Sequence, residues 1–152
     1  MEKRIVVLCA GRIGRAIAAD LSRLYSVTVV DIKEEALSGL PKEIEKIAGD
    51  ITDPQQLEKI VNGANLVVSA VPSVLGHNIL KTLIGFGKDV VDIAFSAEDP
   101  FLLDELAHRH NVTVAVDCGV CPGTNNLIVG YEDQRMHLEN SPCNNAAHTG
   151  HG

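Results

Sequence analysis

The sequence predicts an α/β fold of three layers, in which helices cover both faces of a doubly wound parallel sheet. Three observations predict it. Short runs rich in Ile and Val alternate with segments whose apolar residues recur at helical spacing. Each strand and its following helix take about 20 to 30 residues, a length that suits parallel strands joined by helices. The chain of 152 residues has room for one such domain.

The predicted strands and helices alternate along the first three-quarters of the chain. The strands are predicted over residues 4–9, 26–31, 43–48, 65–71, 89–95 and 112–116. The helices between them are predicted over residues 13–24, 34–40, 54–62, 75–86 and 99–110. The expected strand order is 3-2-1-4-5-6, that of the Rossmann fold, with ligands bound at the carboxyl ends of the strands where the order reverses.

Local signals set the limits of the early elements. Glycines follow the first strand at once and lead into apolar residues at helical spacing. Pro41 closes the short second helix, because a proline cannot continue it. Asp53 is expected to cap the third helix, with Pro54 at the first helical position, and Gly63 stops that helix.

Similar sequence patterns predict the later elements, up to residue 130, after which the composition changes. The strand over 65–71 is almost wholly apolar, as expected when helices cover both faces of the sheet. The last predicted helix has a stripe that we expect in the core: Leu102, Leu103, Leu106 and Ala107. Residues 131–152 are polar and rich in Asn and His, so we expect a poorly ordered extension.

Composition excludes several classes of protein. A net charge of −7, with two Tyr, three Phe and no Trp, leaves no basic stripe or stacking platform for a nucleic acid. The longest apolar runs, 5–10 and 64–72, are far shorter than the ~20 residues that span a membrane. The first of them is also too short for a signal peptide. Four cysteines are too few for a disulfide scaffold, so we expect reduced thiols in a cytoplasmic protein.

The turn after the first strand carries part of a dinucleotide-binding fingerprint. In the G-x-G-x-x-G template the glycine positions fall on Cys9, Gly11 and Gly14, so the first glycine is missing. Gly11 still lets the backbone approach a pyrophosphate, and Gly14 lets the helix pack on the strand. The exposed amides around Arg12 and Ile13, at the helix start, are expected to bind the phosphates.

An acidic residue stands where the fingerprint requires one. Asp31 ends the second strand twenty residues after Gly11, in position to accept the hydroxyls of the adenosine ribose. A carboxylate there repels a 2′-phosphate, which favours NAD over NADP, while Lys33 keeps NADP possible. The alternative is that Asp31 only caps the next helix.

Two further segments are expected beside the dinucleotide. Asp50 and Ile51 follow the third strand, where this fold places a polar group and an apolar wall next to the adenine. Plain turn chemistry explains these two residues equally well. Ala70, Val71 and Pro72 end the fourth strand, and suit a loop lying against the pyrophosphate and the nicotinamide-side ribose.

Four segments together resemble one family. They are Cys-Ala-Gly-Arg-Ile-Gly-Arg-Ala-Ile-Ala at 9–18, Ala-Gly-Asp-Ile-Thr-Asp at 48–53, Ala-Val-Pro-Ser at 70–73 and Asp-Cys-Gly-Val-Cys-Pro-Gly-Thr-Asn-Asn at 117–126. With them, residues 3–131 resemble the nucleotide-binding domain of the saccharopine dehydrogenase family, which includes saccharopine reductase, lysine 6-dehydrogenase and carboxynorspermidine dehydrogenase. The last segment is the most specific, since it is similar to the family's Pro-Gly segment that leads into the substrate domain.

The resemblance implies an oxidoreductase that oxidises an amine, or reduces the matching imine, with a nicotinamide nucleotide. Among these enzymes, the sequence as a whole looks closest to lysine 6-dehydrogenase, which implies a small amino-acid substrate. Family enzymes continue into a substrate domain, whereas this chain keeps Pro122, Gly123 and a helix over 125–131. We expect an NAD-binding domain over 1–130, the polar tail over 131–152 and no substrate domain. A truncated chain, a frameshifted one and a natively short protein all fit this pattern.

No motif assigns a catalytic residue. His77, early in the fourth helix near the expected nicotinamide end, is a candidate general base or a histidine bonded to the backbone. Asp92 on the fifth strand and Asp117 after the sixth both point to the carboxyl edge of the sheet. Each is a candidate to hold a substrate ammonium group, or simply a cap for the next segment.

Three functional hypotheses follow. The first is an NAD-binding domain of an amino-acid dehydrogenase, inactive or weakly active alone. The second is a stand-alone NAD-sensing module that forms a homo-oligomer through apolar residues uncovered near the end of the fold: Val120, Leu127, Ile128 and Val129. The third is a redox or metal module built on a pair of cysteines and further ligands: Cys118, Cys121, Cys143, His137, His148 and His151. The histidine spacing does not match a zinc motif, so we predict no metal site.

Overall fold

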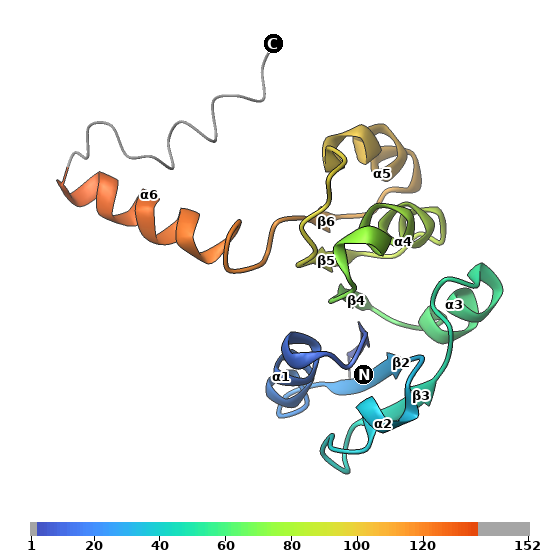
Figure 1. Ribbon diagram of the computed structural model, residues 1–152. Helices are drawn as coiled ribbons and strands as arrows, with labels where there is room; N and C mark the ends of the chain where they lie inside the picture. Colours follow the sequence, from blue (N-terminus) through green and yellow to red (C-terminus); the bar gives the residue numbers. More distant parts are fainter. Residues whose placement is uncertain (1–2, 137–152) are drawn as a thin grey trace.

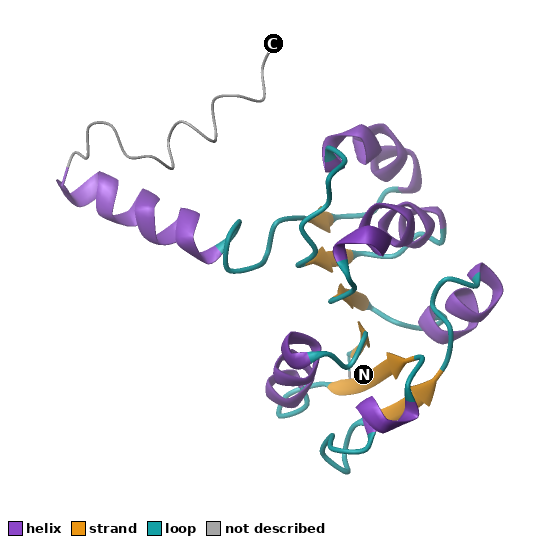
Figure 2. Cartoon of the chain, viewed as in Figure 1, coloured by secondary structure: helices purple, strands orange, loops and turns teal. Residues whose placement is uncertain are grey.

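The computed structural model describes residues 3–136, which are coloured along the chain in Figure 1. The strands are β1 (Arg4–Leu8), β2 (Ser26–Asp31), β3 (Glu45–Ala48), β4 (Leu66–Ser69), β5 (Val90–Asp92) and β6 (Val114–Ala115). The helices are α1 (Arg12–Leu21), α2 (Glu34–Leu37), α3 (Pro54–Val61), α4 (Ser73–Gly85), the 3-10 helix η1 (Pro100–Leu103), α5 (Asp104–His110) and α6 (Thr124–Met136). Strands and helices alternate along the chain, as Figure 2 shows.

The strands form one parallel sheet in the order β3-β2-β1-β4-β5-β6, which confirms the predicted order. β1 pairs with β2 on one side and with β4 on the other, so that Val7 is aligned with both Val29 and Val68. The order reverses between β1 and β4. The carboxyl ends of these two strands therefore flank the crevice where this fold binds ligands.

Two apolar clusters, one on each face of the sheet, make the molecule three layers thick. β1 supplies both clusters, because Val6 and Leu8 belong to one of them and Ile5 and Val7 to the other. Residues of α3 and α4 bury the first cluster, and residues of α1 and α2 bury the second. A strand buried on both faces needs a continuous apolar run, which is the pattern that the sequence showed.

The expected cap of α3 is confirmed. The Asp53 carboxylate accepts a hydrogen bond from the Gln55 N–H at 2.9 Å, and Pro54 occupies the first helical position. Together these residues satisfy one free N–H group at the helix start and remove another.

The helix predicted over 99–110 is divided, because η1 precedes α5. Leu103 is buried, and Leu106 and Ala107 pack against the first cluster. Leu102, however, is 74% exposed, so the expectation that it belongs to the core is wrong. The tighter turn of a 3-10 helix changes the angle between successive side chains, so a stripe drawn at α-helical spacing does not hold there.

Several elements end away from their predicted limits: α1 stops at Leu21, α2 at Leu37 and β4 at Ser69, where residues 24, 40 and 71 were expected. β5 was predicted to run to residue 95 but stops at Asp92, whose carboxylate accepts a hydrogen bond from the Ala94 N–H at 3.1 Å as the chain leaves the sheet. α6 continues to Met136, five residues beyond its predicted end, and projects away from the sheet in Figure 1. The prediction for residues 137–152 lies outside the described residues.

Candidate functional site

One cleft lies at the carboxyl ends of the strands, around the reversal of strand order. Its volume is about 790 Å³, within the range of small-ligand sites. All ten residues predicted to bind a cofactor line it: Gly11, Arg12, Ile13, Gly14, Asp31, Asp50, Ile51, Ala70, Val71 and Pro72. They come from the ends of β1, β2, β3 and β4, so the sheet topology brings together segments that lie far apart in the sequence.

The turn between β1 and α1 keeps the geometry of the fingerprint without its first glycine. Cys9 has a φ of 72°, in the left-handed region that glycine adopts most easily, and its N–H donates to the Val30 carbonyl at 2.8 Å. A Cβ at Gly14 would overlap the Cys9 carbonyl oxygen, so only glycine fits there. A Cβ at Gly11 would meet no atom within 4 Å, which leaves open space in the cleft beside this backbone.

The start of α1 is available to an anion. Gly11 is the N-cap residue and has no side chain to accept hydrogen bonds from the first N–H groups of the helix. Gly11, Arg12 and Ile13 line the cleft, and the free N–H groups of a helix start carry the positive end of the helix dipole. The residues present therefore fit the phosphates of a dinucleotide.

The Asp31 carboxylate is fixed by two backbone donors. The Ala10 N–H donates to Oδ2 at 2.8 Å, and the Lys33 N–H donates to Oδ1 at 2.9 Å. Each oxygen keeps a further lone pair, so the carboxylate can still accept hydroxyl groups from a ligand. The N-cap residue of α2 is Lys33, so Asp31 is not the cap of this helix.

The Cys9 thiol lines the cleft and is held in its neutral form. Burial raises its pKa to about 11, and the negative charge of Asp31 adds to the effect. A thiol that does not ionise adds no negative charge beside bound phosphates. The cysteine in place of the first glycine therefore adds no negative charge to the turn.

The loop after β3 forms a tight turn and also borders the cleft. The Asp50 carboxylate accepts hydrogen bonds from the Thr52 hydroxyl at 2.6 Å and the Thr52 N–H at 2.8 Å, and these bonds lower the pKa of Asp50. This is the turn chemistry that the sequence left open. Asp50 and the buried Ile51 also border the cleft, so the same turn presents a polar group and an apolar wall to it.

Sequence reasoning missed several residues that line this cleft: Ala10, Ile32, Ala36, Thr52, Leu75, Ile93, Ala94 and Phe95. Ala10, Ile32 and Thr52 are chain neighbours of predicted residues, so the signal for them was present. The segment 93–95 gave no signal, because the sequence placed it inside a strand that in fact ends at Asp92.

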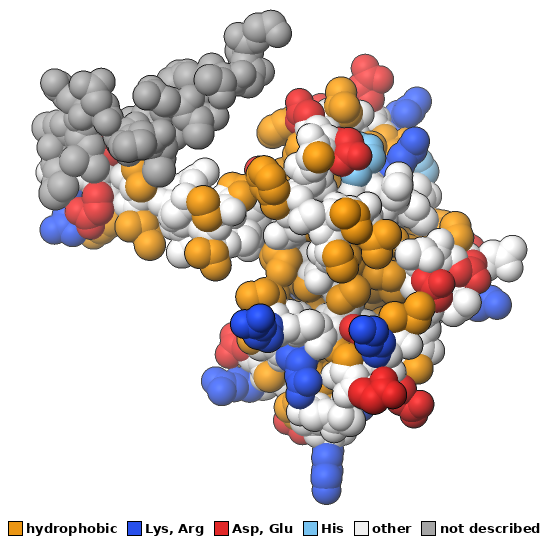
Figure 3. Space-filling view, in the orientation of Figure 1, with side chains coloured by type: hydrophobic (Ala, Val, Ile, Leu, Met, Phe, Trp, Pro, Cys, Tyr) orange, Lys and Arg blue, Asp and Glu red, His pale blue; other side chains and the backbone are white. Residues whose placement is uncertain are grey.

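Figure 3 shows where hydrophobic and basic side chains lie on one face of the molecule. In the space-filling view, hydrophobic side chains gather between the half that carries α1 and α2 and the half that carries α4 and α5 (Figure 3). Lys and Arg side chains lie over α1 and α2 in the same view. Of the basic residues, Arg12 and Lys33 line the cleft itself.

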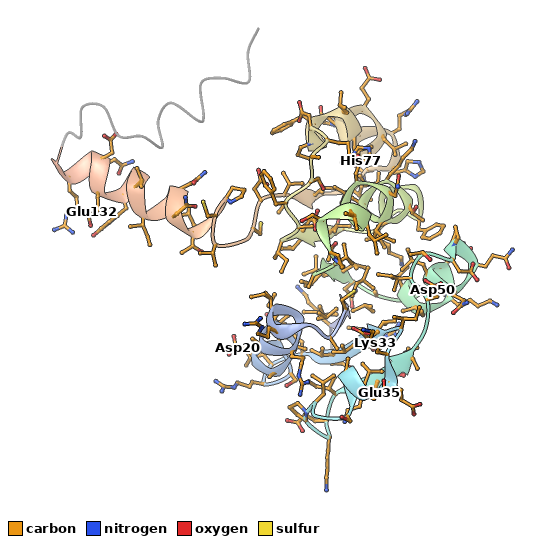
Figure 4. All side chains as sticks on the ribbon, in the orientation of Figure 1. Asp20, Lys33, Glu35, Asp50, His77 and Glu132 are labelled. Atoms are coloured by element: carbon orange, nitrogen blue, oxygen red, sulfur yellow. The ribbon has the colours of Figure 1, made fainter. Side chains whose placement is uncertain are left out.

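The structure brings two of the three catalytic candidates together and leaves the third apart. Asp92 and Asp117 line a second cavity of about 210 Å³, which shares Ala94 and Phe95 with the cleft. Burial raises the pKa of Asp92; hydrogen bonds from the Ala94 N–H and the Ser69 hydroxyl oppose the rise, and the charge of Asp117 adds to it. His77 is half-buried on α4 and borders neither cavity. Figure 4 shows His77 well apart from Lys33 and Asp50.

The cysteines after β6 are free thiols. Burial raises the pKa of Cys118, and the charges of Asp117 and Asp92 add to the effect, which disfavours the reactive thiolate. Within residues 3–136, no group of three or more His, Cys, Asp or Glu side chains is placed to hold a metal ion. The other proposed ligands lie outside that range: Cys143, His137, His148 and His151.

None of the helices in the described part of the chain is both long enough and apolar enough to cross a membrane.

Comparison with known proteins agrees with the fold. Alpha-aminoadipic semialdehyde synthase of Arabidopsis thaliana is 24% identical over 95 residues, which are 62% of this chain and 9% of that protein. The apo form of saccharopine dehydrogenase (L-Glu forming) from Saccharomyces cerevisiae superposes with a TM-score of 0.79 at 23% identity, covering 89% of this chain and 31% of that one. GenD2 from gentamicin A biosynthesis, solved with NAD, gives a TM-score of 0.60 at 20% identity, covering 76% of this chain and 34% of its own. The chain thus spans about a third or less of these relatives.

One family model matches most of the chain. The model described as the saccharopine dehydrogenase NADP binding domain matches residues 5–116. The match begins in β1 and ends just after β6, so it reaches every strand of the sheet and includes all the residues that line the cleft. The chain therefore belongs to the saccharopine dehydrogenase family, of which it carries the NAD(P)-binding domain.

Proposed function

We propose that residues 1–130 form the cofactor domain of an oxidoreductase acting on a CH–NH or CH–NH₂ group of an amino acid, as a lysine 6-dehydrogenase does. One observation carries the cofactor site. Loops from four strands converge on one cleft, with open space at Gly11 and a fixed carboxylate at Asp31. The amino-acid substrate rests on the family and on the two carboxylates beside the cleft, Asp92 and Asp117.

Each part of the cleft has a role in this proposal. The N–H groups at Arg12 and Ile13 bind the pyrophosphate, and Asp31 accepts the hydroxyls of the adenosine ribose. Asp50 and Ile51 border the adenine.

At the other end of the dinucleotide, Ala70, Val71 and Pro72 lie along the nicotinamide-side ribose. When bound, the nicotinamide supplies the hydride chemistry, and the protein supplies orientation and a dry surface.

NAD is the preferred cofactor in this proposal. The Asp31 carboxylate repels a 2′-phosphate, whereas the positive charges of Arg12 and Lys33, which also line the cleft, attract it. NADP therefore binds, but more weakly than NAD.

Calorimetric titration of the chain with NAD and with NADP tests the proposal. We expect NAD to bind more tightly than NADP. Asp31→Asn should weaken NAD at least tenfold and remove the preference, because the neutral amide keeps one acceptor but loses the charge. Asp20→Asn, an exposed position on α1, serves as the matched control and should bind like the wild type. Absence of binding of either nucleotide to the folded chain overturns the cofactor site, and tighter binding of NADP overturns the preference.

A second candidate function is favoured by the exposure of α6. Three of the apolar residues predicted to be uncovered are largely exposed: Val120, Leu127 and Ile128. Patches of this kind commonly serve as protein interfaces. A module that binds NAD and self-associates through this surface would show a mass in solution that rises with concentration. A constant monomer mass speaks against it.

A further inference from the structure

A pair of cysteines between β6 and α6 takes no part in the proposed function. Cys118 and Cys121 are separated by two residues, and both are free thiols exposed to solvent. Neither of them lines the cofactor cleft. Two cysteines at this spacing, next to a strand and a helix, are typical of a site that cycles between a dithiol and a disulfide.

The backbone around the two cysteines folds back on itself. The Thr124 N–H donates to the Gly119 carbonyl at 3.0 Å, so the chain reverses direction between these residues. Gly123 has a φ of 128°, and a Cβ there would overlap the carbonyl oxygens of Gly119 and Asp117. The two ends of the turn are therefore in direct backbone contact, which glycine at this position permits.

This turn shortens the distance that a bond between the two thiols has to span. A fully extended segment would hold the Cα atoms of Cys118 and Cys121 about 10 Å apart, whereas a disulfide requires roughly 4–7 Å. Because the chain reverses over 119–124, these Cα atoms lie closer together than the extended limit. A disulfide then needs only a local adjustment of the turn.

The two cysteines are held by different elements. The Cys118 N–H donates to the Asp92 carbonyl at 3.0 Å, which ties this cysteine to the end of β5. The Cys121 Sγ accepts a hydrogen bond from the side-chain amide of Asn125, on α6, at 3.2 Å. The pair thus lies at the junction between the sheet and α6, which projects from the sheet in Figure 1.

The surroundings also give the two thiols different roles. Burial raises the pKa of Cys118, and the charges of Asp117 and Asp92 add to the effect, so this thiol is the poorer nucleophile. At Cys121 the Asn125 amide supplies a donor that stays bonded when the sulfur carries a negative charge. Cys121 is therefore the attacking thiol, and Cys118 completes the disulfide.

We propose that Cys118 and Cys121 form a reversible disulfide by exchange with a small-molecule disulfide. The Cys121 thiolate attacks one sulfur of that molecule, so that a mixed disulfide forms, the original S–S bond breaks and one thiolate leaves. Cys118 then attacks the Cys121 sulfur, which forms the bond between the cysteines and releases the second thiolate. The two cysteines are oxidised, the small disulfide is reduced to two thiols, and the two protons pass from the cysteines to the leaving thiolates.

Titration of the full chain with mixtures of oxidised and reduced glutathione tests the proposal. Free thiols are alkylated and counted by mass spectrometry. We expect two thiols to be lost together as the share of oxidised glutathione rises, and to be recovered as it falls. The bond should lie within one proteolytic peptide that contains both Cys118 and Cys121. Alkylation of both cysteines even with oxidised glutathione alone overturns the proposal.

Single serine variants test the order of the two steps. Cys118→Ser should retain glutathione on Cys121 as a stable mixed disulfide, because the second thiol is missing. Cys121→Ser should take up glutathione at Cys118 at least threefold more slowly. Equal or faster uptake by Cys121→Ser overturns the assignment of Cys121 as the attacking thiol.

The other two cysteines of the chain supply the matched controls. Cys9→Ser and Cys143→Ser should each still lose two thiols together. If Cys143→Ser prevents the loss, Cys143 is a member of the pair and the proposal is wrong. The test does not depend on the cofactor site, since a wild type that forms the disulfide but binds neither NAD nor NADP overturns that site alone.

Discussion

At Cys9 the backbone takes the conformation of the glycine that the fingerprint lacks. A left-handed φ of 72° costs a non-glycine residue roughly 1–2 kcal/mol. The hydrogen bond to the Val30 carbonyl and the packing of the half-buried side chain against the core hold it there. The turn is therefore set by its surroundings, and the glycine is dispensable at this position.

The other two fingerprint glycines should respond differently to a methyl group. Gly11→Ala should leave stability within about 0.5 kcal/mol of the wild type, because the new Cβ meets no atom, yet weaken NAD at least tenfold by filling the cleft. Gly14→Ala should lower the free energy of unfolding by about 1–3 kcal/mol, because it overpacks against Cys9.

Chemical denaturation and calorimetry measure the two effects. Gly85→Ala, at an open position in α4 away from the cleft, is the control and should change neither property for the worse. A loss of stability in Gly11→Ala equal to that in Gly14→Ala would contradict the assignment of open space at Gly11.

Asp92 should make the fold less stable when it is ionised. Its pKa is raised above the ordinary 3.8, mainly by burial, so the folded state binds the proton more tightly than the unfolded state. The penalty is complete above the raised pKa, shrinks as the pH falls through it, and is absent below the ordinary value. Asp92→Asn should therefore raise Tm at pH 7, and the gain should vanish near pH 3.

Thermal unfolding across this pH range provides the measurement. Asp20→Asn, at an exposed site, corrects for effects of acid on the rest of the protein. A gain in Tm that is the same at both ends of the range would count against a raised pKa in the folded state.

Among the elements, those with strong local signals were predicted best. The second strand and the cap of α3 match the prediction residue for residue, since a β-branched run and an Asp-Pro pair each specify a local structure. The end of β5 and the exposure of Leu102 were missed, because both depend on a turn that the apolar pattern does not encode. Periodicity identifies an element, but a side-chain hydrogen bond, such as the one that Asp92 accepts from the Ala94 N–H, decides where the element stops.

Helix α6 should contribute little to the stability of the domain. Leu127 is 75% exposed, whereas Leu83 in α4 is completely buried. We expect Leu127→Ala to leave the free energy of unfolding nearly unchanged and Leu83→Ala to lower it by about 2–5 kcal/mol.

Urea denaturation at two protein concentrations checks this contrast. An effect of Leu127→Ala that grows with concentration would indicate self-association through α6. A large effect at both concentrations would contradict the exposure of this residue.

At the scale of the whole molecule, the candidate site was more predictable than its details. The ten predicted cofactor residues line one cleft because the order of parallel strands fixes which loops meet, and that order follows from the alternation of elements alone. The left-handed Cys9 and the pairing of Asp92 with Asp117 in one cavity needed the three-dimensional structure. Spacing along a chain carries no information about φ or about neighbours across strands.

The 152-residue chain should bind NAD but form NADH from lysine only slowly. The cavity beside the cleft offers carboxylates for an ammonium group and no cation for a carboxylate, so the substrate is held at one end. An active site that leaves its reactants open to water also loses electrostatic stabilisation. Absorbance at 340 nm reports NADH formation, and turnover at the rate of about 1–10³ s⁻¹ usual for enzymes would refute the prediction.

The pairing of β1 with β4 joins the β3-β2-β1 half of the sheet to the β4-β5-β6 half. A dinucleotide in the cleft touches the loops that follow both strands, so opening this joint would release it. Bound cofactor then adds about 2.7 kcal/mol to the cost of opening at a free concentration of about 100 Kd. Amide hydrogens of Val67 and Val68 should accordingly exchange with solvent more slowly when NAD is bound, which makes the cofactor a cross-link between the two halves of the fold.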